Sequence, residues 1–367
     1  MQSLRTFLHQ ALPRIWQRRG LCACLLWPLS QLYAAGWQRK KRQQLGLARN
    51  RHLPVPILVV GNVVAGGAGK TPTVIAVVQH FQQLNVQVGV ISRGYGRSAQ
   101  APTCMAVTAA SSAQQVGDEP LLIHRRTGVP VFVGANRFQA AQILLQQHPT
   151  TQLLICDDGL QHLALPRQGE ICVMDERGIG NGWLLPAGPL REPWPRRTTV
   201  LLHNAAQPSA HNTQTVQSVP PQPTCVPPDQ PTFWARRQLA DKAIRADGQT
   251  QPLRDWIQNR QPIVALAGIA QPKRFFAMLR LQGLELKQAL ALPDHAETET
   301  LIQQALYITQ QGLPIVCTEK DAVKLWPQAP HIWAIPLQLV PEPAFFTALT
   351  NWWHAQPQTA GICHAVK

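Results

Sequence analysis

The residues that decide the fold are Ile57-Leu-Val-Val-Gly61, then the glycine-rich stretch that ends in Lys70-Thr-Pro72, and then the apolar run Val74–Phe81. The first segment is continuously apolar and β-branched, which predicts a buried strand, and the apolar spacing of the last predicts a helix. Glycines between a strand and a helix let backbone N–H groups face an anion at the positive end of that helix. The stretch therefore predicts a nucleotide-binding phosphate loop, made of Gly66, Gly67, Ala68, Gly69, Lys70, Thr71 and Pro72.

Two side chains of this loop carry specific chemistry. We expect Lys70 to reach the β- and γ-phosphates and the Thr71 hydroxyl to ligate Mg²⁺, while Pro72 suits the first turn of a helix. The common G-x-x-x-x-G-K-[ST] pattern is not met, because Val64 stands where the first glycine is required. The shorter pattern that does match is typical of the deviant branch of P-loop NTPases, although Ala65 replaces the lysine that partitioning and targeting ATPases of that branch usually carry.

Short apolar runs continue along the chain and alternate with segments of helical period. Continuously apolar strands separated by helix-length segments predict a P-loop NTPase-like α/β fold, with a mostly parallel sheet covered by helices on both faces. A smaller C-terminal α/β domain is expected from the last three runs. The expected strands are Ile57–Gly61, Val86–Ile91, Val129–Val133, Leu153–Cys156, Ile171–Met174, Val200–Leu202, Ile263–Ala267, Ile315–Thr318 and Ile332–Ile335.

Composition suggests where the domains begin and end. At 367 residues the chain is long enough for two domains, and the 24 residues of 208–231 contain seven prolines, which break helices and remove ladder donors. We expect five segments in chain order: a membrane-associated segment 1–50, a P-loop kinase core 51–207, a proline-rich linker 208–231, a smaller α/β domain 232–345 and a tail 346–367.

The positive charge is concentrated near the amino terminus. Lys and Arg number 34 against 19 Asp and Glu, a formal net charge of +15, and the first acidic residue is Asp118. Ten of the basic residues lie within residues 1–51, around an apolar stretch that runs from Leu21 to Gly36. Nucleic-acid binding is not expected, because aromatic side chains are not interleaved with the basic ones.

The apolar stretch is too short for an ordinary membrane span. Sixteen helical residues rise roughly 24 Å against a hydrocarbon core of roughly 30 Å, and Pro28, Ser30 and Gln31 interrupt it. Cations at both ends favour a helix that lies in the headgroup layer of an anionic membrane surface, at the cytoplasmic face of the inner membrane, peripheral or monotopic. A tilted span, a cleaved signal peptide and an ordinary buried helix are the alternatives.

The eight cysteines predict neither a zinc site nor a disulfide framework. They include no C-x-x-C pair, and Cys156, Cys172 and Cys317 lie inside runs that predict buried strands. We therefore expect small, reduced core residues, as is usual in the cytosol.

Two pairs of acidic residues are candidates for metal binding or for a second functional site. Asp157 and Asp158 follow an expected buried strand, and aspartates at such a strand end can hold Mg²⁺. A plain Asp-Gly turn is the alternative. Gly117-Asp118-Glu119-Pro120 is either a second site or simply the start of a helix.

Several strings of the sequence together resemble the tetraacyldisaccharide 4'-kinase family, the lipid A 4'-kinases, from about residue 10 to about residue 340. The Leu-Arg-Glu-Pro and Thr-Glu-Lys-Asp-Ala strings are not general features of P-loop proteins. The matching strings are Val60-Gly-Asn, Gly66-Gly-x-Gly-Lys-Thr-Pro72, Ser92-Arg-Gly-Tyr-Gly96, Gly117-Asp-Glu-Pro120, Asp157-Asp-Gly-x-Gln-His162, Leu185-Pro-Ala-Gly-Pro-Leu-Arg-Glu-Pro193, Ala267-Gly-Ile-Ala-x-Pro-x-Arg-Phe-Phe276, Pro293-Asp-His295 and Thr318-Glu-Lys-Asp-Ala-Val-Lys324.

The resemblance implies two α/β/α domains hinged around an ATP cleft and transfer of a phosphate to a membrane-embedded tetraacyldisaccharide 1-phosphate. It implies Asp118 and His295 as a catalytic pair beside Lys70, with ATP and Mg²⁺ as cofactors and Asp157 and Asp158 near the metal. Domain closure would then be needed to assemble the site. The resemblance also implies that six further residues surround substrate or nucleotide, and it assigns no individual role to any of them: Arg93, Tyr95, Arg137, Gln161, Arg191 and Glu192.

A different class of protein remains the alternative. A deviant P-loop switch ATPase or GTPase could recruit a partner to a membrane through the same basic segment. Ala65 and the lack of an N-K-x-D guanine motif weigh against it. Phosphate transfer to an added disaccharide lipid, rather than simple hydrolysis, would separate the two.

Overall fold

The computed structural model describes residues 12–98, 100–204, 226–227, 229–269, 271–292, 298–309 and 312–357. The described chain forms two compact units, each assembled from separate stretches of sequence. The first unit uses residues 1–91, 137–236 and 341–367, and the second uses 92–136 and 237–340. His295, most of the expected linker 208–231 and the last ten residues of the expected tail lie outside the described residues.

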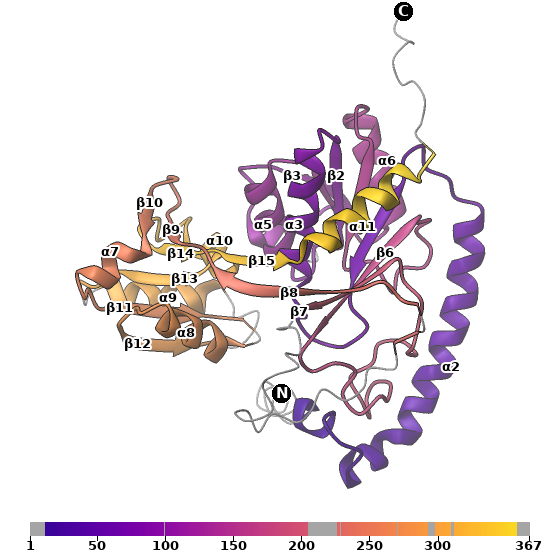
Figure 1. The fold of residues 1–367 in the computed structure, drawn as a ribbon, viewed down its shortest axis with the longest axis horizontal. Coiled ribbons are helices and arrows are strands. Elements are labelled where there is room, and N and C mark those ends of the chain that lie inside the picture. Colours follow the sequence, from indigo (N-terminus) through magenta and orange to yellow (C-terminus); the bar gives the residue numbers. More distant parts are fainter. Residues whose placement is uncertain are drawn as a thin grey trace, which may run out of the picture. The chain divides into compact units, whose positions relative to one another are not determined.

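The first unit contains a large parallel sheet. Its strand order is β8-β7-β6-β1-β5-β2, and each of these neighbouring pairs is parallel. Figure 1 labels β8, β7, β6 and β2 of this sheet. The predicted mostly parallel α/β fold class is therefore confirmed. The elements are α2 Leu21–Arg49, β1 Ile57–Gly61, α3 Lys70–Gln83, β2 Val88–Ser92, α6 Arg137–Gln147, β5 Leu153–Asp157, β6 Gly169–Asp175, β7 Val200–Asn204, β8 Thr232–Leu239 and α11 Pro343–His354.

Strand register brings the polar residues of this sheet together at one edge. Val60 of β1 stands beside Asp157 of β5 on one side and Ile171 of β6 on the other. Because parallel strands all end at the same edge, the carboxyl ends of β1, β5, β6 and β7 place Gly61, Asp157, Asp175 and Asn204 around the loop that leads into α3.

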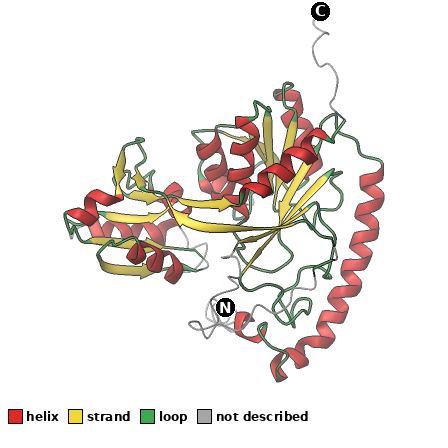
Figure 2. Cartoon of the chain, in the orientation of Figure 1, coloured by secondary structure: helices red, strands yellow, loops and turns green. Residues whose placement is uncertain are grey.

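Helix α2 is longer than the apolar stretch that predicted it. It spans 29 residues without interruption and includes Pro28 (Figure 2). One face docks on the rest of the first unit: the Ser30 hydroxyl donates to the Leu184 carbonyl at 2.7 Å, and the Tyr33 hydroxyl donates to the Arg191 carbonyl at 2.8 Å. Among the described residues, no helix has both the length and the apolar character required for a membrane span.

The carboxyl-terminal helix α11 packs against α3. His80 lies 2.9 Å from the Thr350 hydroxyl, and the ring of Phe81 meets the ring of Trp353 edge-on at 6.0 Å between centroids. Residues 343–354 therefore complete one side of the first unit, although they come last in the described chain.

The second unit contains a six-stranded sheet of its own, with the order β10-β9-β14-β13-β11-β12. Strands β14, β13, β11 and β12 are parallel, and β9 and β10 join antiparallel at one edge. The elements are β3 Cys104–Val107, α4 Ala113–Val116, α5 Asp118–Thr127, β4 Val131–Gly134, β9 Lys242–Ile244, β10 Thr250–Pro252, α7 Leu253–Gln258, β11 Ile263–Ala267, α8 Pro272–Leu281, β12 Leu286–Ala291, α9 Thr298–Thr309, β13 Ile315–Thr318, α10 Glu319–Leu325, β14 Trp333–Ile335 and β15 Leu337–Pro341.

This second sheet buries both faces. Alternate residues of β11 enter two separate cores: Ala265 packs with α7 and α8 side chains such as Trp256 and Phe276, whereas Val264 packs with α9 and α10 side chains such as Leu301. Burial on both faces explains why β11 is apolar at every position and does not alternate.

Candidate functional site

The glycine-rich loop connects β1 to α3 with a backbone that requires glycine. Gly66 has φ 96° and Gly69 has φ 88°, so both lie in the region that L side chains rarely adopt. Gly69 is the residue before α3, whose first turn contains Lys70, Thr71 and Pro72. The loop therefore points backbone N–H groups and a helix amino terminus toward one place, which is the arrangement that binds phosphate.

Lys70 is buried and lies among oxygen atoms. Its Nζ is 3.3 Å from Oδ1 of Asn62 and 3.5 Å from Oδ1 of Asp158. Both contacts are long for charge-assisted interactions, which are usually about 2.7–2.9 Å. Phosphate oxygens can therefore replace them at low energetic cost.

Asp157 and Asp158 follow each other at the end of β5 but differ in their surroundings. Asp157 is buried, while Asp158 has φ 47° and pairs with Lys70 and also with Arg191, whose NH1 lies 3.2 Å away. Burial opposes ionisation of Asp158, but the charges of Lys70 and Arg191 outweigh it and lower the pKa of this carboxyl. Asp158 is therefore a carboxylate at neutral pH.

Three side chains that the sequence reasoning missed hold the loop in shape. Arg177 forms a two-pronged pair with Asp175 and donates to the Gly67 carbonyl at 3.1 Å, and Asn204 donates to the Ala68 carbonyl at 3.0 Å. Asp175 and Asn204 end β6 and β7. Asp175 comes directly after one expected strand and Asn204 comes two residues after another, and these polar residues at strand ends were the signal that could have found them.

Gln161, Arg191 and Glu192 meet beside the loop. The Gln161 amide donates to the Asn62 carbonyl at 2.9 Å and to Oε1 of Glu192 at 3.3 Å. The backbone N–H of Arg191 donates to the Val63 carbonyl at 2.8 Å. Glu192 is buried, and burial raises the pKa of its carboxyl despite an ion pair with Arg196.

Arg137 begins α6, and its side chain is buried. Its charge lowers the pKa of Asp158 and also acts on His162, the last residue of the Asp157–His162 string. Burial, together with the charges of Arg137 and Arg167, lowers the pKa of His162 to about 3. This imidazole is therefore neutral at physiological pH, and its Nε2 is buried and has no hydrogen-bond partner among the described residues.

The second unit brings together three other strings of the sequence. A side-chain carbon at Gly94 would lie 2.8 Å from the Val116 carbonyl, and one at Gly117 would lie 2.8 Å from the Tyr95 carbonyl. The segment that holds Arg93 and Tyr95 thus packs directly on the start of α5, where Asp118 is the first residue. The Tyr95 side chain is largely exposed.

Asp118 is buried and compensated by two lysines of α10. Nζ of Lys324 lies 3.1 Å from its Oδ2, and Nζ of Lys320 lies 3.8 Å from the same atom. Helix α10 is fixed at its start by Asp321, which accepts from the Thr318 hydroxyl at 2.6 Å and from the Gly268 backbone at 3.0 Å. The sequence reasoning quoted this lysine-rich string but assigned no role to either lysine.

His295, the proposed partner of Asp118, lies outside the described residues. Within the described ranges, no group of three or more His, Cys, Asp or Glu side chains is placed to hold a metal ion. The side chains that we considered for Mg²⁺ are hard oxygen donors, Thr71, Asp157 and Asp158. Proteins usually bind Mg²⁺ through one or two carboxylates together with phosphate oxygens of the substrate.

Comparisons with known proteins point to one family. The model of the tetraacyldisaccharide-1-P 4'-kinase family matches residues 22–354. A tetraacyldisaccharide 4'-kinase of Acidovorax sp. (strain JS42) is 48% identical over 343 residues, which cover 93% of this chain and 94% of that protein. The enzyme of the same name from Polaromonas naphthalenivorans (strain CJ2) is 47% identical over 351 residues, with 93% and 94% covered.

A solved structure agrees with the fold. The crystal structure of LpxK from Aquifex aeolicus in complex with ATP superposes with a TM-score of 0.70, at 24% identity, and covers 90% of this chain and 99% of that one. At this identity the match supports the arrangement of the chain in space and not the roles of individual residues.

Proposed function

The chain belongs to the tetraacyldisaccharide-1-phosphate 4'-kinase family, and we propose that it transfers the γ-phosphate of ATP to the 4'-hydroxyl of a tetraacylated glucosamine disaccharide 1-phosphate, a step of lipid A biosynthesis. The observation that carries the proposal is the phosphate loop at the sheet edge, where the buried Lys70 makes long contacts with Asn62 and Asp158. The match to this family over residues 22–354 supports the same conclusion.

We assign nucleotide binding to the loop and to the start of α3. The backbone of Gly66, Gly67, Ala68 and Gly69 cradles the phosphates, and Lys70 exchanges its contacts with Asn62 and Asp158 for phosphate oxygens. In the transition state the charge on the transferred phosphoryl group is spread over its oxygens, so a buried cation at this place lowers the barrier.

We assign Mg²⁺ to Thr71 with Asp157 or Asp158, the remaining ligands being phosphate oxygens and water. Asp158 suits this role because the pKa of its carboxyl is lowered and because it already lies beside Lys70. When bound, Mg²⁺ neutralises charge on the β- and γ-phosphate oxygens.

For the acceptor hydroxyl we propose Asp118 and His295 as the acid–base pair. The sugar oxygen forms a bond to the γ-phosphorus, the bond from that phosphorus to the β–γ bridging oxygen breaks, and the hydroxyl proton passes to the pair. Lys320 and Lys324 compensate the charge of Asp118 in the described structure, so they hold its carboxylate ready in a fixed orientation. Arg93 and Tyr95 lie next to this residue and are proposed substrate contacts.

We propose that α2 brings the enzyme to its lipid substrate at the cytoplasmic face of the inner membrane, peripherally or monotopically. Leu21, Leu25 and Leu32 are 86%, 79% and 71% exposed, and they share one side of the helix, opposite the buried Ala23 and Ser30. Basic residues precede and follow this face, so an anionic surface would attract it electrostatically while the leucines insert.

A transfer assay tests the proposed function. The enzyme is mixed with γ-labelled ATP, Mg²⁺ and the tetraacylated disaccharide 1-phosphate in detergent micelles, and the lipids are separated by thin-layer chromatography. We expect label in a lipid with one more phosphate. Release of inorganic phosphate without labelled lipid would instead support the switch ATPase.

A further inference from the structure

The backbone carbonyl groups of residues 65–68, in the phosphate loop, all face side chains of the first unit. Arg177 contacts two of them: its NH2 donates to the third carbonyl at 3.1 Å, and its NH1 lies 3.5 Å from the first. Asn62 donates to the second carbonyl at 3.1 Å, and Asn204 donates to the fourth at 3.0 Å. The loop is therefore held from outside through its carbonyl groups.

These contacts decide where the backbone N–H groups of the loop point. In a planar trans peptide the N–H of one residue points opposite to the carbonyl of the residue before it. Each N–H of residues 66–69 therefore points away from the side chain that holds the preceding carbonyl. These four N–H groups donate to no acceptor among the described residues. Successive N–H groups in this state form an anion-binding concavity.

Arg177 is itself fixed by Asp175, the last residue of β6. Its Nε donates to Oδ1 of Asp175 at 3.0 Å, and its NH2 donates to Oδ2 at 2.7 Å. The backbone N–H of Arg177 also donates to Oδ1, at 3.1 Å. Asp175 is buried, and two parallel bonds between a guanidinium and a carboxylate fix direction as well as distance. The end of the strand thus sets the position of the guanidinium, which in turn holds the loop.

The loop also lies very close to this guanidinium. A Cβ at Gly66 would lie 3.1 Å from NH1 of Arg177, and the φ of this glycine is 96°. A side chain here would strain the backbone and press on the guanidinium. The glycine and the arginine therefore fit one another, although they are far apart in the sequence.

We propose that Arg177 is a positioning residue for nucleotide binding, which holds the glycine-rich loop in the conformation that receives the phosphates and does not itself touch the nucleotide. The proposal rests on the proposed function, because it concerns how that enzyme binds ATP. Glycines give a free loop many backbone conformations. A ligand that binds only one conformation loses affinity in proportion to the fraction of molecules that adopt it. Arg177 raises that fraction before the nucleotide arrives.

Direct contact with the transferred phosphate is the alternative role for an arginine at this place, because arginines stabilise phosphoryl transfer in other enzymes. The geometry favours positioning. Nε and NH2 already donate to Asp175 and to the Gly67 carbonyl, and the guanidinium lies on the side of that peptide opposite its N–H. The two roles also differ in their consequences: a contact with the γ-phosphate acts on kcat and requires ATP, whereas a held loop serves ATP and ADP alike.

The test measures the Kd values of ATP and ADP by isothermal titration calorimetry on the full-length protein, beside kcat for lipid transfer at saturating ATP. Arg177→Lys keeps the positive charge but loses the planar fork that joins Asp175 to the loop. We expect both Kd values to rise by the same factor, roughly tenfold, as when the binding conformation falls to about a tenth of the molecules. The kcat should change by less than about threefold, because bound ATP restores the loop.

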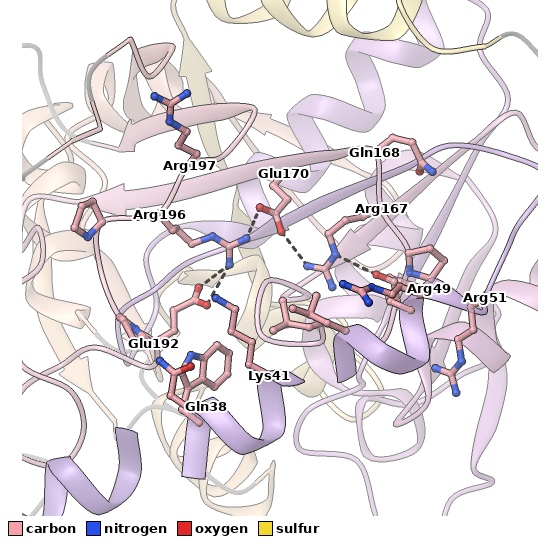
Figure 3. Close-up of a pocket in the computed structure, with 18 of the residues that line it drawn as sticks. Gln38, Lys41, Arg49, Arg51, Arg167, Gln168, Glu170, Glu192, Arg196 and Arg197 are labelled. Atoms are coloured by element: carbon pink, nitrogen blue, oxygen red, sulfur yellow. Dashed lines mark hydrogen bonds and ion pairs between the residues drawn. The ribbon is translucent and has the colours of Figure 1, made fainter. Parts of the chain in front are cut away.

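A charge-neutral variant separates the loop contact from the charge of the arginine. Asp175→Asn/Arg177→Gln leaves the net charge unchanged and leaves no buried carboxylate without its cation. We expect the same weakening of both nucleotides, with the thermal midpoint as the measure of an intact fold. Arg197→Gln is the control for the loss of a cation: Arg197 belongs to the same unit and joins none of the ion pairs drawn around Arg196 (Figure 3). This control should leave both Kd values unchanged.

Two results would overturn the proposal. Unchanged Kd values in Arg177→Lys and in the charge-neutral variant would mean that the loop keeps its shape without Arg177. A loss of kcat of about a thousandfold, with ADP affinity unchanged, would mean that Arg177 contacts the γ-phosphate directly. A wild-type protein that binds both nucleotides but labels no lipid would contradict the proposed function, while the same Kd values would still decide the role of Arg177.

Discussion

The two units each contain an aspartate–lysine pair with a buried member, and the pairs are built in opposite ways. In the first unit Lys70 lies 3.5 Å from Asp158, and it also contacts Asn62 at 3.3 Å, while Arg191 shares the aspartate. In the second unit it is the aspartate that is surrounded: Asp118 has Lys324 at 3.1 Å and Lys320 at 3.8 Å.

The difference indicates which residue of each pair can exchange its protein partner for a ligand. Lys70 directly follows the glycine-rich loop, and its contacts with Asn62 and Asp158 are long, so a triphosphate can displace these two partners. Lys320 and Lys324 sit on a helix that Asp321 fixes at its start, so they restrain Asp118. One pair therefore supplies a cation and the other holds a carboxylate in place, and four predictions test this contrast.

The largest effect is expected for Lys70→Ala. Removal of the cation that faces the β- and γ-phosphates should lower kcat by about a thousandfold, because electrostatic groups of this kind contribute losses of that order. The fold should remain intact in a thermal unfolding experiment. If the variant retains more than about a tenth of the wild-type kcat in the lipid transfer assay, Lys70 does not have the role assigned to it.

Asp118→Ala and His295→Ala should each lower kcat by about a hundredfold with little change in ATP affinity, as is usual when a general acid or base is lost. The double variant should lose much less than the product of the two effects, because residues that act as one unit are not additive. The measurement is kcat for the three variants under saturating ATP. Fully multiplicative losses would mean that the two residues act independently.

Lys324→Met should destabilise the protein by about 2 kcal/mol, because it removes the nearer of the two lysines that compensate the charge of the buried Asp118. Urea unfolding measures the effect, and Asp118→Asn in the same background should restore part of the loss. Lys320→Met is the matched control and should cost less. If both lysine substitutions lower the stability equally, the nearer Lys324 does not compensate Asp118 better than the more distant Lys320, and the expectation is contradicted.

The smallest effect is expected for Asp158→Asn. The pKa of Asp158 is lower in the folded protein than in the unfolded chain, so the carboxylate stabilises the fold at neutral pH and this stabilisation disappears as the pH falls below about 4. The side chain is partly exposed, so we expect the variant to be less stable by less than about 1 kcal/mol at pH 7 and equally stable in acid. If the variant remains less stable than the wild type in acid, the loss of stability comes from packing and not from the charge of the carboxylate.

Much of the fold and part of the site could be predicted because their signals are local. The strand, glycine loop and helix around Lys70 follow one another in the sequence. Strands β1 and β11 are apolar along their whole length, and β5 is apolar up to its last residue, Asp157, because both faces of these strands are buried. The α/β class follows from these signals. Lys70, Asp158, Gln161, Arg191 and Glu192 were named from the sequence, and the structure brings them together.

The remainder depends on contacts between distant parts of the chain. Strands β9 and β10 are only three residues each and contain Lys242 and Thr250, so neither has an apolar pattern. The contact of Asp118 with Lys324 joins residues about two hundred positions apart, and the contacts of Arg177 with the loop join distant segments as well. Chain order also gives no sign that residues 92–136 group with 237–340, because nothing in either segment identifies its partner.

The packing of α11 on α3 has a consequence for how the protein is made on the ribosome. The last described helix covers His80 and Phe81 through Thr350, Phe346 and Trp353. The nascent first unit therefore exposes the aromatic surface of α3 while more than two hundred further residues are synthesised, and only a chain that has been translated past residue 354 can cover it. Apolar surface exposed on a nascent chain is the feature that chaperones and proteases bind, so the docking of this helix removes such a surface from them.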